Sequence, residues 1–198
     1  MRQGATDRSS FLGRALVAGG ALALGGLAGA RGDATAAAPS EQQDLRILNF
    51  LLTLEYAQQA LYAEALSEGA VTGELRRFAE VAGDHEDEHI DALRALLGAR
   101  AEPKPTFRFA DAVRDAERFK AAALTLEESA AAGYIGQAAN LTRRRIQDVA
   151  RIVPVEARHA AWIRAIVGRN PAPSAADPAR TPRQVMRTLE RRGFVDGS

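Results

Sequence analysis

The chain has 198 residues, enough for one domain with a substantial core plus extensions. Hydrophobic residues make up 46% of it but aromatics only 6%, and this dominance of alanine and leucine is typical of helical proteins. A net charge of +1 gives no electrostatic reason to expect nucleic-acid binding. The sequence has no cysteine, which excludes disulfides, cysteine-ligated zinc, iron–sulfur clusters and lipoprotein anchoring.

Residues 1–38 are predicted to be an export signal peptide that is removed from the mature protein. Arginines precede an apolar run over 15–30, which is short and glycine-rich for a membrane span, and Ala36-Ala37-Ala38 fits a cleavage site. Arg8-Ser9-Ser10-Phe11-Leu12 resembles a twin-arginine signal with serine in place of the second arginine, and Sec export is the alternative. We expect a periplasmic or extracellular protein without a stable membrane anchor, the alternative being a retained N-terminal anchor.

The first two of four long helices are predicted over about 40–69 and 74–97. The first begins at Ser40, an N-cap with Gln43 at capping-box spacing. Its inward stripe contains a carboxylate: Leu48, Leu52, Glu55, Gln59, Tyr62 and Leu66. The second stripe contains a carboxylate and an imidazole: Leu75, Phe78, Ala82, Glu86, His89, Leu93 and Leu96. His85 lies about 100° around the helix from Glu86 and is expected on the surface.

The second half repeats this arrangement after a proline-containing connection over 98–107. A third helix is predicted over about 110–139, with Glu127 on its inward face and Glu128 as the adjacent alternative. A fourth is predicted over about 142–167, with the inward stripe Ile146, Val149, Val153, Glu156, His159, Ile163 and Ile166. Pro154 either bends this helix or divides it into two segments. Residues 169–198 are predicted to be a Pro/Ala-rich tail with a short helix over 182–191.

The most informative pattern is Glu-x-x-His, which occurs at Glu86–His89 and again at Glu156–His159. Residues three apart lie on the same side of a helix, so each pair offers a carboxylate and an imidazole to one point. Four inward glutamates are too costly to bury unless their charge is compensated. Because the stripes carry no lysine or arginine nearby, two divalent metal ions are the expected compensation, in a site of approximate twofold symmetry.

The chain resembles the ferritin-like superfamily, and within it the exported bacterial ferritin-like and desiccation-related group. The resemblance covers about 41–168 and rests on Leu48 to Tyr56, His85-Glu86-Asp87-Glu88-His89, Leu126-Glu127 with Tyr134, and Val155 to Trp162. It implies an all-α, four-helix ferritin-like bundle of two antiparallel helix pairs with a crossover connection. It also implies that Glu55, Glu86 and His89 hold one metal and that Glu127, Glu156 and His159 hold the other, with some glutamates bridging.

The resemblance further implies a carboxylate-bridged centre of two iron ions per chain, with manganese as the alternative and zinc compatible with the ligands. The expected activity is oxidation of Fe(II) by O₂ or peroxide, in defence against oxidative or metal stress. The alternatives are a manganese catalase-like peroxide-removing enzyme, a non-enzymatic exported stress or structural protein, and a cage-forming iron store, which requires a homo-oligomer. Tyr62 and Tyr134 lie on the ligand stripes, either next to the ligands or as ordinary core residues.

Overall fold

The computed structural model describes residues 38–195, so residues 1–37 of the predicted signal peptide lie outside the described part. The described residues form helices and no strands, which confirms the predicted all-α class. The elements are α2 (Glu41–Ser67), α3 (Gly73–Leu97), the 3-10 helix η1 (Gly98–Arg100), α4 (Ala116–Ala138), α5 (Arg143–Val149), α6 (Val153–Ile166) and α7 (Pro182–Arg191). Among them, no helix has both the length and the apolar character needed to cross a membrane.

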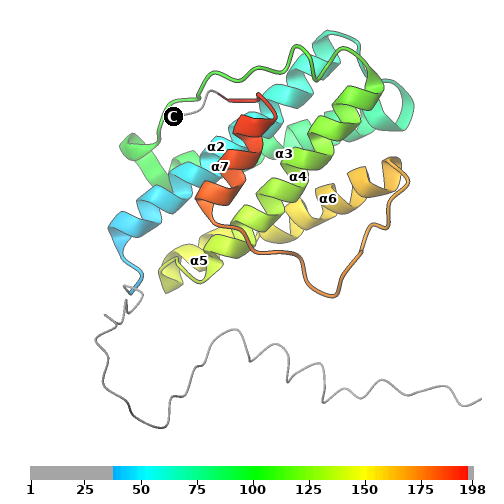
Figure 1. Cartoon of the computed structure of the whole chain (residues 1–198). Coiled ribbons are helices and arrows are strands. Elements are labelled where there is room, and N and C mark those ends of the chain that lie inside the picture. Colours follow the sequence, from blue (N-terminus) through cyan, green and yellow to red (C-terminus); the bar gives the residue numbers. More distant parts are fainter. Residues whose placement is uncertain (1–37, 196–198) are drawn as a thin grey trace, which may run out of the picture. The chain divides into compact units, whose positions relative to one another are not determined.

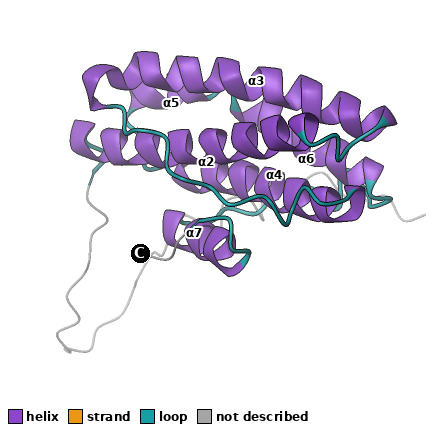
Figure 2. Ribbon diagram, turned by 90° about the horizontal axis from the view of Figure 1, so that it is seen from above, coloured by secondary structure: helices purple, strands orange, loops and turns teal. Residues whose placement is uncertain are grey.

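Helices α2, α3, α4 and α6 lie side by side and form a four-helix bundle (Figures 1 and 2). α2 contacts both α3 and α4, and α6 contacts both α4 and α3, which closes the ring. α2 and α4 run in opposite directions, because Tyr62 lies beside Glu127 while Tyr134 lies beside Glu55. The segment between α3 and α4 must therefore run along the length of the bundle, as the predicted crossover requires.

A buried asparagine of α2 holds the start of this crossover. The side-chain amide nitrogen of Asn49 donates to the carbonyl oxygen of Arg100 over 3.1 Å, and its Oδ1 accepts the backbone N–H of Glu102 over 2.8 Å. Further along, the Lys104 ammonium donates to the side-chain oxygen of Gln59 over 2.6 Å. Hydrogen bonds from both residues therefore hold the first part of the connection against α2.

The third predicted helix begins later than expected, at Ala116 rather than near residue 110. Asp115 has an extended backbone and its carboxylate accepts the N–H of Arg118 over 2.8 Å, which makes it the N-cap. Val113 is nevertheless buried, from a turn that precedes the helix. The apolar pattern therefore extends into residues that precede the helix, because a side chain can be buried without a helical backbone.

The fourth predicted helix is two helices, which decides between the two alternatives for Pro154. This proline lies in the first turn of α6, where its missing N–H removes no helical hydrogen bond. Thr142 precedes the first of these two helices, α5. Its N–H and its hydroxyl both donate to the buried carboxylate of Asp44 in α2, over 2.9 and 2.6 Å. The division gives α6 its own start just before Glu156, so the proline positions the second Glu-x-x-His pair rather than disturbing it.

Helix α7 lies against α4 on the outside of the bundle (Figure 1). It is opened by a complete capping box between Thr181 and Gln184, and it buries Val185 and Leu189 fully. The backbone N–H of Arg180 donates to the carbonyl of Ala132 in α4 over 2.9 Å. The segment before α7 thus lies directly on the α4 backbone.

This close approach requires a glycine, and it leads to a prediction. A Cβ added to Gly136 would lie 2.0 Å from the carbonyl oxygen of Arg180, which is backbone and cannot turn away. We expect Gly136→Ala to destabilise the protein by about 1–3 kcal/mol, measured as a fall in melting temperature.

A matched control lies in α3. A Cβ at Gly83 would meet only the Cβ of Tyr62, at an ordinary 3.5 Å. Gly83→Ala should therefore gain about 0.5–1 kcal/mol from the higher helix propensity of alanine. Equal effects of the two substitutions would show that the tail does not dock on α4 as described.

Candidate metal centre

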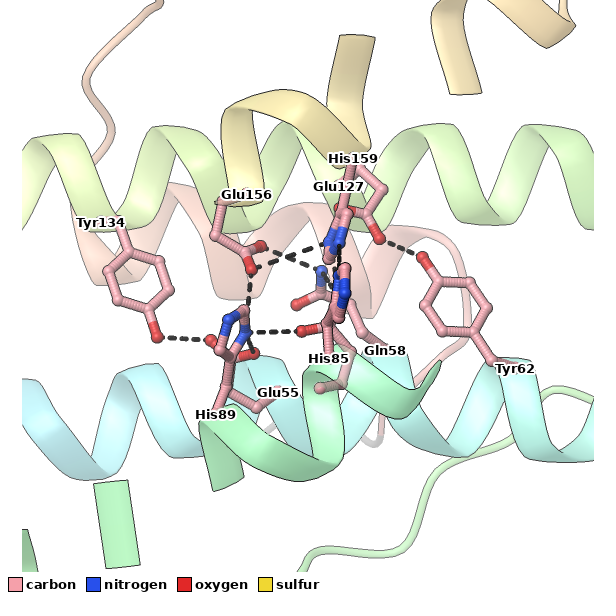
Figure 3. Close-up of polar contacts among 10 residues, drawn as sticks. Glu55, Gln58, Tyr62, His85, His89, Glu127, Tyr134, Glu156 and His159 are labelled. Atoms are coloured by element: carbon pink, nitrogen blue, oxygen red, sulfur yellow. Dashed lines mark hydrogen bonds and ion pairs between the residues drawn. The ribbon is translucent and has the colours of Figure 1, made fainter. Parts of the chain in front are cut away.

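The six side chains predicted as metal ligands meet in the middle of the bundle (Figure 3). They come from all four long helices: Glu55 from α2, Glu86 and His89 from α3, Glu127 from α4, and Glu156 and His159 from α6. The four carboxylates are fully buried, and the two histidines are 8% and 2% exposed. The alternative Glu128 is turned aside and accepts a hydrogen bond from Arg164 over 3.0 Å, so the register that favours Glu127 is the one observed.

These side chains form two overlapping groups, each with donor atoms within 4.8 Å of one another. One group is Glu55, Glu86, His89 and Glu156, and the other is Glu86, Glu127, Glu156 and His159. Glu86 and Glu156 belong to both groups. The arrangement has two positions that could each hold a metal ion, with two carboxylates placed to serve both.

The two imidazoles reach the shared carboxylates through the same ring nitrogen. Nδ1 of His89 lies 2.9 Å from Glu86 Oε2, and 3.2 Å from Glu55 Oε2 and from Glu156 Oε1. Nδ1 of His159 lies 3.1 Å from Glu86 Oε1 and 3.7 Å from Glu127 Oε2. The Glu-x-x-His spacing thus turns both Nδ1 atoms toward the same interior space.

Two tyrosines flank the cluster, one at each end (Figure 3). The hydroxyl of Tyr62 donates to Glu127 Oε1, and that of Tyr134 donates to Glu55 Oε1. Burial first, and then the neighbouring carboxylate, raises the pKa of each phenol well above its ordinary value, so both remain donors. Each tyrosine follows the glutamate of its own helix by two turns and holds the glutamate of the opposite helix, which is a twofold-related arrangement.

The cluster places four carboxylates in the buried interior, where negative charge is unfavourable. Burial raises the pKa of Glu55 and Glu127 well above the ordinary value, and burial and the Glu156 charge together raise that of Glu86 to about 7. Burial alone would lower the pKa of His89, but its bonds to three carboxylates outweigh this and raise it to about 12. Within residues 38–195, only these histidines form ion pairs with the four carboxylates.

Unused lone pairs support a fit between these residues and a metal ion. Glu127 Oε2 is buried and has no hydrogen-bond partner in the described part of the chain. Glu156 Oε1 and His159 Nδ1 are also buried, and their near polar contacts are with other members of the cluster, over 3.2 Å to His89 and 3.1 Å to Glu86. All three belong to the same one of the two groups. Buried polar atoms are normally hydrogen-bonded, so a cluster of ligand atoms that face one another, one of them without any partner, indicates a metal ion between them. Carboxylate oxygens with imidazole nitrogens suit iron and manganese and are compatible with zinc.

The family model of the ferritin-like domain matches residues 43–169. The chain belongs to the ferritin-like family. The match runs from the first turns of α2 past the end of α6 and includes all six clustered side chains. No curated protein matches the chain. The superfamily predicted from the sequence is confirmed, whereas the exported, desiccation-related group stays a prediction.

Sequence reasoning missed two polar residues of this ferritin-like cluster. Gln58, rather than the predicted Gln59, faces inward, and its amide nitrogen donates to Glu156 over 3.1 Å and to Glu86 over 3.5 Å. His85 was predicted on the surface but is half-buried, with Nδ1 2.9 Å from Nε2 of His159. Gln58 could have been found from its i+3 spacing after Glu55. His85 could not, because its partner comes from another helix.

The charge balance predicts how the metal-free protein responds to pH. The pKa of Glu86 rises from an ordinary 4.5 to about 7 on folding, so between these values the folded chain keeps a proton that the unfolded chain has released. Stability therefore falls as the pH rises through this window, by on the order of 3 kcal/mol from this group. His89 acts in the same direction above its ordinary value of 6.5, because its pKa is also raised.

We expect the melting temperature of metal-free protein in chelator to be several degrees lower at about pH 8 than at about pH 5. Glu86→Gln should weaken this dependence, since Glu55, Glu127 and His89 with their raised pKa values remain, while Glu88→Gln, on the exposed face of α3, should leave it unchanged. A melting temperature that rises across the same interval would contradict the charge assignment.

Proposed function

We propose that this protein is an exported ferritin-like protein that holds two metal ions at the Glu/His cluster and oxidises Fe(II) with O₂ or peroxide. The observation that carries the proposal is the sharing of Glu86 and Glu156 between two groups of donor atoms. Two carboxylates placed between two positions favour a pair of ions over a single ion. Glu55 with His89, and Glu127 with His159, would complete the two positions.

Fe(II) is the substrate in this proposal. Each of two Fe(II) ions gives up one electron, and O₂ takes up the two electrons with two protons to become hydrogen peroxide, or hydrogen peroxide takes them up to become water. The chain supplies six donors whose charge matches two divalent ions, in surroundings that exclude water from the carboxylates. Tyr62 and Tyr134 keep the outer oxygens of Glu127 and Glu55 bonded, which leaves their other oxygens directed inward.

His89 is the most solvent-exposed of the six clustered side chains. This imidazole keeps 10% of its side-chain surface exposed, whereas the carboxylates of Glu55, Glu86 and Glu156 have none exposed. A centre that touches solvent at one ligand can receive Fe(II) and O₂ without unfolding. This exposure supports a site that exchanges its substrate rather than one that is sealed for stability alone.

The test is oxidation of Fe(II) in air by the metal-free protein. We expect ferric absorbance to develop faster than in buffer, and the Glu86→Gln variant to lose this acceleration while Glu88→Gln keeps it. Protein that binds two Fe(II) ions but oxidises them no faster than buffer would instead favour the non-enzymatic stress or structural protein.

Export is the second part of the proposal, and its support is the arginine–apolar–Ala36-Ala37-Ala38 pattern of the first 38 residues. The expected mature N-terminus lies near Pro39. Mass spectrometry of protein isolated from its natural source tests this directly, and an intact N-terminus at Met1 or Arg2 would refute it.

A further inference from the structure

The repeated halves of the centre match in their ligands and tyrosines but not in the residue that precedes each Glu-x-x-His glutamate. The residue before Glu86 is His85, and the residue before Glu156 is Val155, which has no polar side chain. His85 bonds to His159, so one of the two ligand imidazoles has a side-chain partner on its outer nitrogen (Figure 3). The contacts of the other, His89, are through Nδ1 with the carboxylates. The two metal positions are therefore chemically different.

The geometry of the two imidazoles indicates which of them would donate when a metal ion is bound. Nδ1 of His85 and Nε2 of His159 are 2.9 Å apart, with the rings 13° from parallel and their centroids 5.1 Å apart, so the nitrogens meet edge to edge. Nδ1 of His159 faces the carboxylates, 3.1 Å from Glu86 Oε1. A metal ion held by this Nδ1 would require the ring proton on Nε2, and Nδ1 of His85 would then accept it.

We propose that His85 is a positioning residue that holds the His159 ring with Nδ1 toward the carboxylates and accepts its Nε2 proton when a metal ion is bound. The inference rests on the proposed function, since it concerns one of the two metal positions. A histidine that ligates a metal needs its other nitrogen bonded to an acceptor, which fixes both tautomer and ring orientation. In this chain the acceptor is a second imidazole, and it serves only the position formed by Glu86, Glu127, Glu156 and His159.

The experiment is a titration of metal-free protein with Mn(II), for the wild type and three variants. We expect His85→Ala to lower the affinity for one of the two ions about 10–100-fold and to leave the affinity for the other unchanged. In His85→Asn the side-chain oxygen occupies the place of Nδ1 on Cγ, so this variant should restore affinity to within about threefold, by the same reasoning. Asp91→Ala, exposed on the same helix, is the matched control and should bind as the wild type does.

Each outcome separates this proposal from the proposed function. If the wild type binds two ions and His85→Ala binds them with the same affinity, or loses affinity for both equally, only the role of His85 is overturned. A wild type that binds no ion overturns the metal centre.

The tautomer can be read by ¹⁵N NMR of the chain's three histidines in protein loaded with diamagnetic Zn(II). His159 should show the Nε2–H form with its Nδ1 bound to the metal, and His85→Ala should lose this uniform state while its helix content stays unchanged. Observation of the Nδ1–H form at His159 of the loaded protein would overturn the proposal whatever the Mn(II) titration gives.

Discussion

Replacing either shared carboxylate, by Glu86→Gln or Glu156→Gln, should abolish tight binding of both metal ions. Each of these glutamates belongs to both groups of donor atoms, so its loss removes a negative donor from the two positions at once. Glutamine keeps the size of the side chain, and its amide ligates a divalent ion far less strongly than a carboxylate does. The expected result is a fall from about two ions per chain to fewer than one at micromolar free metal, measured by titration and by elemental analysis after desalting.

The unshared glutamates provide the matched comparison. Glu55→Gln and Glu127→Gln each alter one position, so each variant should retain one ion. Glu88→Gln, exposed on α3, should retain two. If all four buried substitutions removed the same amount of metal, the two positions would not be built around shared carboxylates.

The second large effect concerns the protein without metal. Replacing buried ionic groups with apolar residues of similar size is often neutral or stabilises by about 1–4 kcal/mol. Glu55→Leu with Glu127→Leu alone would leave the buried hydroxyls of Tyr134 and Tyr62 without acceptors, at a cost of about 1–3 kcal/mol each. We therefore expect the fourfold variant, which adds Tyr62→Phe and Tyr134→Phe, to melt higher than metal-free wild type.

At about 2–4 °C per kcal/mol for a chain of this size, the gain should amount to several degrees. The double-leucine variant should melt below the fourfold variant, and neither should bind two ions. Thermal unfolding in chelator, followed by circular dichroism, gives all three melting temperatures. A fourfold variant less stable than metal-free wild type would show that the carboxylates stabilise the fold without metal.

Helical periodicity predicted four long helices with Glu55 and Glu127 facing inward, and the resemblance to the ferritin-like superfamily implied their arrangement as two antiparallel pairs. Periodicity failed at the start of α4, where Asp115 caps the helix and the buried Val113 lies in the turn before it. A pattern of buried side chains reports burial, and the helix boundary depends on a capping hydrogen bond that periodicity does not contain. Pro154 was ambiguous for the same reason, since an inward stripe continues across a break in the backbone.

The ligands could be predicted because their spacing is local, whereas the residues around them depend on contacts between helices. Glu86 and His89 are three apart on one helix, so their convergence follows from helical geometry alone. His85 points away from that stripe, and only the position of α6 relative to α3 brings it to His159. Gln58 rather than Gln59 faces inward, although Glu55 and Tyr62 on the same helix are buried as predicted. Adjacent residues lie about 100° apart, and within a wide inward face periodicity does not decide between two such neighbours.

The most direct test of the central claim is the amount of metal held by each chain. Wild-type protein is loaded with Fe(II) without oxygen, or with Mn(II), separated from free metal, and analysed for metal and protein together. The account predicts about two ions per chain, with the Glu86→Gln variant below one under the same treatment. A wild type that retains no iron, manganese or zinc, while its helix content is intact, would contradict it.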